Sequence, residues 1–296
     1  MKSGEARIAV HVAAVLFGLT GILGELIQGS AWLITAGRAA FASLSLLLFM
    51  RHLGHGIARP GRAVSLSVGL AGLLLAIHWV SFFMAVKIGG IAIATLGFAS
   101  FPAFITLFEG LFFHERTRAF EWLIVAIVSV GLGLVAPSFN FRDEATTGLL
   151  WAIGSGLSFA LFTLANRKAV GQWPAHALAC IENAIVAALT LPWCLAEFTG
   201  LRASDWLWLF ILGVVCTAFS HALLVASLSR LKARSAAIII ALEPIYAIAF
   251  AALFFAQYPS VRALLGGALI IGAILISSLD KSRTPAMRAD RIDING

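Results

Sequence analysis

The sequence predicts an all-α integral membrane protein with ten transmembrane helices in two inverted five-helix repeats, both termini lying in the cytoplasm. Three observations support this prediction: the apolar composition, an internal repeat and the distribution of Lys and Arg. Hydrophobic residues make up 60% of the 296 residues, charged residues make up 12%, and the mean hydropathy is +0.97. A soluble domain is closer to half apolar and a quarter charged, so lipid must cover much of this chain.

Two stretches of the sequence, 85–136 and 227–278, follow the same pattern. Each has a polar turn, an apolar helix with a proline in mid-span, an aromatic-rich end, a short polar link and a glycine-rich apolar helix. Pro102 and Pro244 occupy matched positions that are 142 residues apart, near half of the chain length. Internal duplication in so apolar a chain is typical of secondary transporters.

Apolar runs of helical length follow one another along the sequence. Most approach the roughly 20 residues that cross a hydrocarbon core, and they do not alternate as the strands of a barrel do. The ten predicted helices cover about residues 7–27, 31–50, 64–86, 88–113, 119–137, 147–167, 175–197, 206–228, 233–256 and 262–279. The corresponding predicted parts are a first repeat at 1–137, a periplasmic linker at 138–146, a second repeat at 147–279 and a polar cytoplasmic tail at 280–296.

Positive charge indicates the orientation of the predicted helices. With the N-terminus inside, sixteen Lys and Arg fall on cytoplasmic segments, and four fall outside, namely Lys87, Arg142, Arg202 and Arg262. Such an excess on one side is the positive-inside pattern, and a wrong helix count would have scrambled it. Five helices per repeat is an odd number, so the second repeat enters the membrane from the opposite side. The net charge of +7 therefore indicates membrane orientation rather than nucleic-acid binding.

A substrate of an inverted-repeat transporter binds near the midplane, where the halves meet beside broken helices. Polar and aromatic residues gather on four of the predicted helices: 64–86, 88–113, 206–228 and 233–256. The predicted substrate-binding residues are His78, Trp79, Phe83, Thr95, Phe98, Phe101, Ser220, His221, Glu243 and Tyr246. Either histidine has the alternative of a buried residue that hydrogen-bonds a neighbouring helix. Pro102 and Pro244 are predicted hinges, with plain packing kinks as the alternative.

Ionisable residues inside a span each cost about 2.5 kcal/mol or more unless they are paired or hydrated. Arg38 and Glu182 lie at symmetric depths in the second and seventh predicted helices. For Arg38 the alternatives are binding a carboxylate and pairing with an acid at a span end, such as Glu25. For Glu243 they are taking a proton, binding an amine and hydrogen-bonding backbone that Pro244 frees.

Over about residues 7–279 the chain resembles the EamA-type proteins of the drug/metabolite transporter superfamily. The resemblance rests on Arg38 in ITAGRAAFASLSLLLF, on Pro102 and Glu115 in ATLGFASFPAFITLFEGLFFHERTRAFEWL, and on Pro244 in AAIIIALEPIYAIAFAALFF. Gln257 replaces the second-repeat counterpart of Glu115, a departure that questions a role for this acid in both halves. The resemblance implies a central cavity lined by the third, fourth, eighth and ninth helices. It also implies export of amino acids, other small metabolites or drugs, and is greatest to bacterial exporters of aromatic amino acids.

We therefore expect a secondary transporter of the bacterial inner membrane that exports small metabolites, with amino acids, including aromatic ones, favoured. A multidrug or other-metabolite exporter of the same fold is the alternative, and a channel or an intramembrane enzyme is a distant one. The enzyme is disfavoured because no nucleophile elbow or HExxH motif is present, and because adjacent Ser220 and His221 point about 100° apart on a helix. The predicted partners are a small-molecule substrate and the lipid bilayer, with no nucleic acid, cofactor or metal; the oligomeric state stays open, and a monomer is compatible.

Overall fold

A computed structural model describes residues 3–52, 54, 62–112, 118–136, 140, 142–166, 174–228, 231, 236 and 239–279. Within these ranges the regular structure is entirely helical, which confirms the predicted all-α class. Seven of the described helices are long and apolar enough to cross a membrane, and three further apolar helices are shorter. The predicted tail at 280–296 and Glu115 lie outside the described residues.

The first half of the chain forms six helices. They are α1 (Ser3–Leu26), α2 (Ala31–His52), α3 (Arg62–Gly89), α4 (Ile91–Phe98), α5 (Phe101–Phe112) and α6 (Ala119–Val135). The predicted run at 88–113 is divided into α4 and α5 by a turn at Ala99 and Ser100, directly before Pro102. A proline has no N–H to continue the helical ladder, and the Ser100 hydroxyl donates to the Gly97 carbonyl at 2.7 Å.

The second half contains less regular helices. They are α7 (Glu144–Asn166), α8 (Ala175–Thr190), the 3₁₀ turns η1 (Leu191–Trp193) and η2 (Leu195–Gly200), α9 (Ala203–Phe210), the π-helix η3 (Ile211–Phe219), α10 (Ser220–Leu228), α12 (Glu243–Phe255) and α13 (Val261–Leu279). The predicted run at 206–228 is thus α-helical at both ends and π-helical in the middle. Pro244 lies in the first turn of α12, as Pro102 lies in the first turn of α5.

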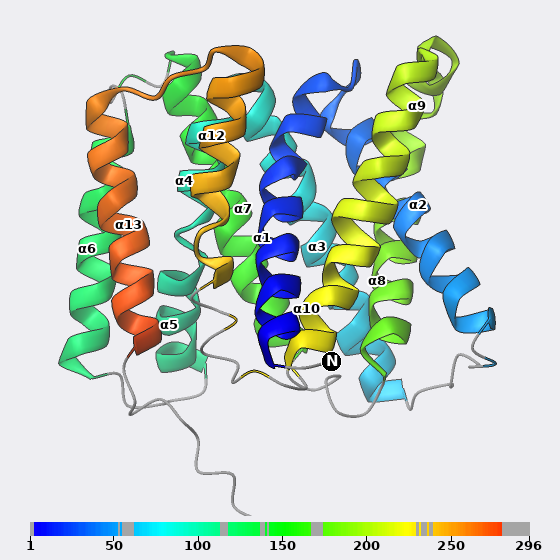
Figure 1. Cartoon of the computed structure of the whole chain (residues 1–296), viewed down its shortest axis with the longest axis horizontal. Helices are drawn as coiled ribbons and strands as arrows, with labels where there is room; N and C mark the ends of the chain where they lie inside the picture. Colours follow the sequence, from blue (N-terminus) through cyan, green and yellow to red (C-terminus); the bar gives the residue numbers. More distant parts are fainter. Residues whose placement is uncertain are drawn as a thin grey trace, which may run out of the picture.

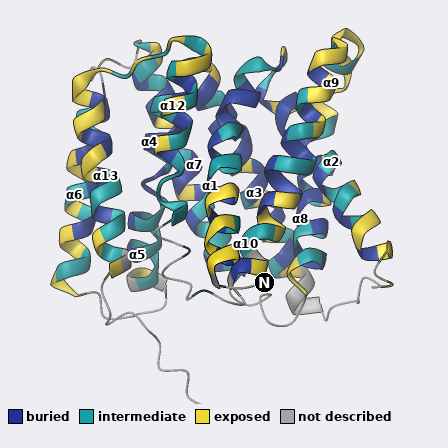
Figure 2. Cartoon of the chain, viewed as in Figure 1, coloured by how far each residue is buried: buried dark blue, intermediate teal, exposed yellow. Residues whose placement is uncertain are grey.

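The helices stand side by side in one bundle, with α6 and α13 at one edge and α2 at the other (Figure 1). Buried residues concentrate in the middle of the bundle and exposed ones on its outside (Figure 2). The largest apolar core contains Phe83 of α3 and Leu212 of η3, both fully buried. Large apolar side chains also point outward, among them Leu66 and Leu253, which are 78% and 75% exposed. Apolar side chains on the outside are what a lipid environment requires of a multi-pass membrane protein.

Helices α3 and α7, from different halves of the chain, pack closely at a pair of glycines. A Cβ atom built on Gly148 of α7 would lie 2.6 Å from the backbone nitrogen of Gly89 at the end of α3. Small residues at such a contact let two backbones approach, which is how membrane helices gain packing energy. The approach of α3 to α7 positions the aromatic residues that both helices contribute to the interior.

The link between α1 and α2 lies at the end of the bundle opposite the N-terminus (Figure 1). Acidic residues of the second half accept hydrogen bonds from it. The backbone N–H and the hydroxyl of Ser30 both donate to the Glu197 carboxylate, at 2.8 and 2.7 Å. The backbone N–H of Gln28 donates to Asp205 at 3.0 Å, and Lys87 donates to the Ile27 carbonyl at 2.9 Å. The bonds to Glu197 and Asp205 connect the two halves of the chain at this end of the bundle, and the bond from Lys87 ties the link to α3 within the first half.

Helix α12 ends at a residue with left-handed backbone. Ala256 has a φ angle of 53°, and the N–H of Gln257 closes the helix on the carbonyl of Ala251 at 3.2 Å. A Cβ in this conformation costs about 1 kcal/mol, and glycine avoids that cost. We expect Ala256→Gly to raise the free energy of unfolding by about 1 kcal/mol in a denaturant titration in detergent micelles. A loss of stability would contradict the left-handed helix end.

Candidate substrate site

A buried arginine from α2 lies in the interior of the bundle. Arg38 is 5% exposed, and its guanidinium carbon lies 4.0 Å from the centre of the Trp79 ring and 5.9 Å from that of Phe83. Its Nε–H donates to the hydroxyl of Thr217 at 2.7 Å. Stacking on an aromatic face stabilises a desolvated cation by about 2 kcal/mol, which offsets part of the cost of burying this charge in a membrane protein.

The π-helix η3 brings Thr217 to Arg38. The Thr217 hydroxyl donates to the carbonyl of Leu212, five residues earlier, at 2.8 Å. The backbone carbonyl of Thr217 lies 2.7 Å from Nδ1 of His221 on α10. The His221 ring meets the Phe17 ring edge-on, with 5.2 Å between the ring centres. The wide turn of a π-helix changes which side chains face a neighbouring helix, and such turns are frequent at functional sites.

Arg38 lacks an acidic partner in the part of the chain that the structure describes. No carboxylate among those residues lies within 4.0 Å of its guanidinium, so the pairing with Glu25 considered as one alternative is not formed. Glu243 of α12 interacts with Arg38 electrostatically without reaching ion-pair distance. Arg38 also interacts electrostatically with His78 and His221. Ionisable groups from α3, α10 and α12 therefore interact with one cation on α2.

A second cluster is aromatic and joins α3, α4, α5 and α7. The His78 ring lies 4.9 Å from both Phe98 and Phe159, and Phe98 stacks on Phe101 at 5.2 Å. Nδ1 of His78 lies 2.7 Å from the hydroxyl of Ser155, and either atom is the donor according to the tautomer. His78 thus connects the aromatic cluster to the charged groups around Arg38.

Two predicted hydroxyl groups bond within their own helices. Thr95 donates to the carbonyl of Ile91 at 2.9 Å, and Ser220 donates to that of Cys216 at 2.7 Å. Both residues are buried. A hydroxyl that donates to its own helix retains lone pairs for accepting a bond, so the predicted substrate contacts of Thr95 and Ser220 would be as acceptors.

Tyr246 lies farther along α12, where that helix crosses α1. Its hydroxyl is 3.3 Å from Nδ1 of His11, and a Cβ on Gly18 would come within 2.9 Å of the Tyr246 Cβ. The predicted hinge residues Pro102 and Pro244 begin α5 and α12, as described above. Their predicted movement remains a prediction.

Glu182 lies on α8, away from the aromatic cluster. It is 5% exposed, it interacts with the side chain of Asn166 at the end of α7, and its Oε1 has no hydrogen-bond partner among the described residues. Glu182 forms no ion pair with Arg38 within 4.0 Å, and the symmetric depths of the two residues remain a prediction.

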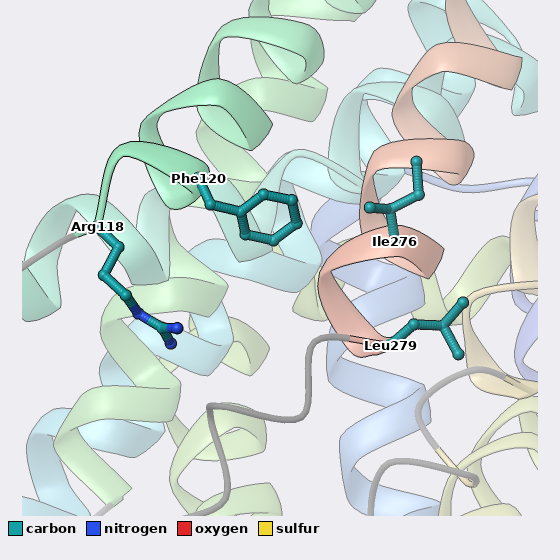
Figure 3. Close-up of a pocket in the computed structure, with 4 residues that line it drawn as sticks. All are labelled: Arg118, Phe120, Ile276 and Leu279. Atoms are coloured by element: carbon teal, nitrogen blue, oxygen red, sulfur yellow. The ribbon is translucent and has the colours of Figure 1, made fainter.

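A surface pocket of about 460 Å³ lies at the edge of the bundle (Figure 3). Arg118 and Phe120 at the start of α6 line it together with Ile276 and Leu279 at the end of α13. Since α6 and α13 stand at the edge of the bundle opposite α2, this pocket lies far from the helix that carries Arg38 (Figure 1). None of the predicted substrate-binding residues lines it.

Comparison with known proteins identifies the family. The EamA-like transporter family matches this chain twice, over residues 6–136 and over residues 146–279. The chain belongs to the EamA-like transporter family. One solved crystal structure matches this chain with a TM-score of 0.62 and 21% sequence identity. The match covers 94% of this chain and 98% of the other, so the fold is already known from another protein.

The EamA relatives include transporters with named substrates. The pseudopaline exporter of Pseudomonas aeruginosa is 30% identical over 82% of this chain and 84% of its own length. The threonine/homoserine exporter of Escherichia coli is 24% identical over 96% of this chain and 90% of its own length. An uncharacterized transporter of Archaeoglobus fulgidus is 28% identical over 94% of this chain and 97% of its own length. This EamA protein is accordingly a multi-pass membrane transporter.

Several residues of this EamA interior were not predicted from the sequence. Ser155 and Phe159 of α7 contact His78, and Thr217 holds Arg38. The signal for α7 was present as a serine and a phenylalanine four residues apart, SGLSF, which share one face of a helix. Thr217 lies among the polar residues of the predicted helix at 206–228, but its contact with Arg38 could not be predicted because it depends on a π-helix.

Proposed function

We propose that the protein is a secondary transporter that exports amino acids, aromatic ones among them, across the inner membrane of a bacterial cell. Ten transmembrane helices in two inverted repeats, with both termini in the cytoplasm, would provide the two halves that alternating access requires. The two matches to one family, at 6–136 and 146–279, support the division into repeats. The relatives that export threonine, homoserine and pseudopaline support small metabolites as the substrate class.

The observation that carries this proposal is the gathering of aromatic and polar groups from both halves in the bundle interior. Trp79, Phe83, Phe98, Phe101 and Tyr246 would surround an apolar side chain. His78, His221, Thr95 and Ser220 would meet the polar groups of the substrate. Desolvating a zwitterion costs several kcal/mol unless each charge meets a partner, so a site with rings at one end and polar groups at the other suits an amino acid.

Alternating access would proceed by rocking of the two halves about this interior. The α1–α2 link, held by Glu197 and Asp205, would keep one end of the bundle shut while the other end admits substrate. Opening that end would require the hydrogen bonds of Ser30 and Gln28 to break. The turns before Pro102 and Pro244 would then serve as hinges, since a helix break absorbs changes in backbone angles.

The proposal is tested by counterflow in liposomes without any ion gradient. We expect saturable exchange of labelled phenylalanine, tryptophan, threonine and methionine, and at least a tenfold loss of phenylalanine exchange in Trp79→Ala and in His78→Ala. Trp122→Ala is the matched control, because Trp122 lies on α6 and is 53% exposed. A folded protein that exchanges none of the four amino acids, with or without a proton gradient, would refute amino-acid export.

A further inference from the structure

The starting observation is a buried cation and a partly buried acid that interact electrostatically without forming an ion pair. Arg38 has five N–H donors, and Nε–H alone has an acceptor among the described residues. Glu243 is partly buried in the first turn of α12 and makes no hydrogen bond or ion pair with another described residue. The two groups interact electrostatically, yet more than 4.0 Å separates their charged atoms.

The surroundings of Arg38 fix its orientation without neutralising it. Trp79 lies under the face of the guanidinium at 4.0 Å, and Thr217 takes its Nε edge at 2.7 Å. These contacts leave the two terminal nitrogens as a fork of N–H groups. A carboxylate accepts two parallel hydrogen bonds from such a fork, and a preorganised arginine loses little side-chain entropy in forming them.

The balance of charge selects the class of substrate. Arg38 and Glu243 together carry no net charge, so a zwitterion bound between them leaves the interior neutral. A phosphate dianion would leave an excess negative charge, and a cationic amine would leave Arg38 without an anion. Buried charges that lack partners are strongly disfavoured in a membrane protein.

We propose that Arg38 binds the carboxylate and Glu243 the ammonium group of an amino-acid substrate. This inference rests on the proposed function and makes it more specific, because it assigns recognition of the zwitterion to two residues from opposite halves of the chain. Arg38 is on α2 and Glu243 on α12, so a bound amino acid connects the halves. The rings of Phe98 and Phe159 are then left to contact the side chain of the substrate.

The test compares amino acids with analogues that lack one charge. Binding to the purified full-length protein is measured by titration calorimetry with phenylalanine, 2-phenylethylamine and 3-phenylpropionate, and with threonine and 1-amino-2-propanol. The unaltered protein is expected to bind the amino acid of at least one set at least about tenfold more tightly than its analogues. Arg38→Gln is expected to abolish the preference over the amine, and Glu243→Gln the preference over 3-phenylpropionate.

Controls separate recognition from folding. Arg142→Gln removes an exposed arginine from the linker and is expected to leave every affinity unchanged. Arg38→Lys keeps the charge but not the fork, so it is expected to retain part of the preference for a carboxylate. Folding of each variant is checked by size-exclusion chromatography and thermal unfolding. If Arg38→Gln does not fold, the inference is tested with Arg38→Lys and Glu243→Gln.

Three results would overturn the inference: an undiminished preference in the altered proteins, no preference in the unaltered protein, or no binding of either amino acid. The outcome is distinguishable from failure of the proposed function. Amino acids that bind with an Arg38-dependent preference but do not exchange across liposomes would contradict export alone. Exchange that ignores the substrate carboxylate would contradict the role of Arg38 alone.

Discussion

Gly213→Ala is expected to destabilise the protein by about 2 kcal/mol and to weaken amino-acid exchange. Gly213 lies in η3, and a Cβ there would be 2.6 Å from both the carbonyl oxygen of Arg38 and the Cβ of Phe41. The nearest atoms include backbone, which cannot rotate away as the end of a side chain can. Helix α2 would have to move off η3, which would lengthen the 2.7 Å bond between Arg38 and Thr217.

The matched control is Gly154→Ala on α7, where a new Cβ would find no atom within 4 Å. Alanine favours a helix over glycine by up to about 1 kcal/mol, so this substitution is expected to stabilise the protein slightly. The two changes are chemically identical and have opposite expected signs in a denaturant titration. If Gly213→Ala were also stabilising, the close approach of α2 to η3 would be wrong, and with it the placement of Arg38.

The helical class and most helix positions could be predicted from the sequence, because a helix in lipid must bury its own backbone and present apolar side chains. The runs at 7–27, 31–50 and 147–167 correspond closely to α1, α2 and α7. Breaks were predicted less well. The prolines at 102 and 244 indicated where α5 and α12 begin. The 3₁₀ turns after Thr190 were not predicted, although Pro192 interrupts the helix predicted at 175–197.

The sequence could predict which residues belong to the candidate site better than it could predict the contacts between them. Costly residues such as Arg38 and Glu243 stand out inside an apolar run, and Pro244 marked the helix that carries Glu243. Which residues contact Arg38 could not be predicted, because a π-helix places Thr217 and because packing of α2 on α3 places Trp79, itself a predicted substrate-binding residue, against the guanidinium. Contacts between helices depend on rotation about the helix axis, which a nearly uniform apolar surface leaves undetermined.

Asp205→Ala is expected to cost about 2 kcal/mol of unfolding free energy. The Asp205 side chain is fully buried and accepts hydrogen bonds from the Gln28 N–H at 3.0 Å, the Arg202 N–H at 2.9 Å and the Arg202 side chain at 2.9 Å. The hydrogen bond from Arg202 to Asp205 raises the pKa of the Arg202 guanidinium, which therefore stays charged. Alanine would leave the N–H of Gln28 without its acceptor and release the α1–α2 link.

Arg202→Gln provides the comparison for this prediction. The Arg202 side chain is 58% exposed, so water replaces its lost bond and the loss of stability is expected to be much smaller. Equal losses in the two variants would mean that the ion pair, rather than the cap on the link, stabilises this end of the bundle. Alternating access adds a second expectation, because the bonds of Asp205 would have to break whenever this end opens. Folded Asp205→Ala protein should therefore exchange amino acids at least as fast as the unaltered protein, with the same affinity, whereas slower exchange would place the link among the parts that stay fixed during transport.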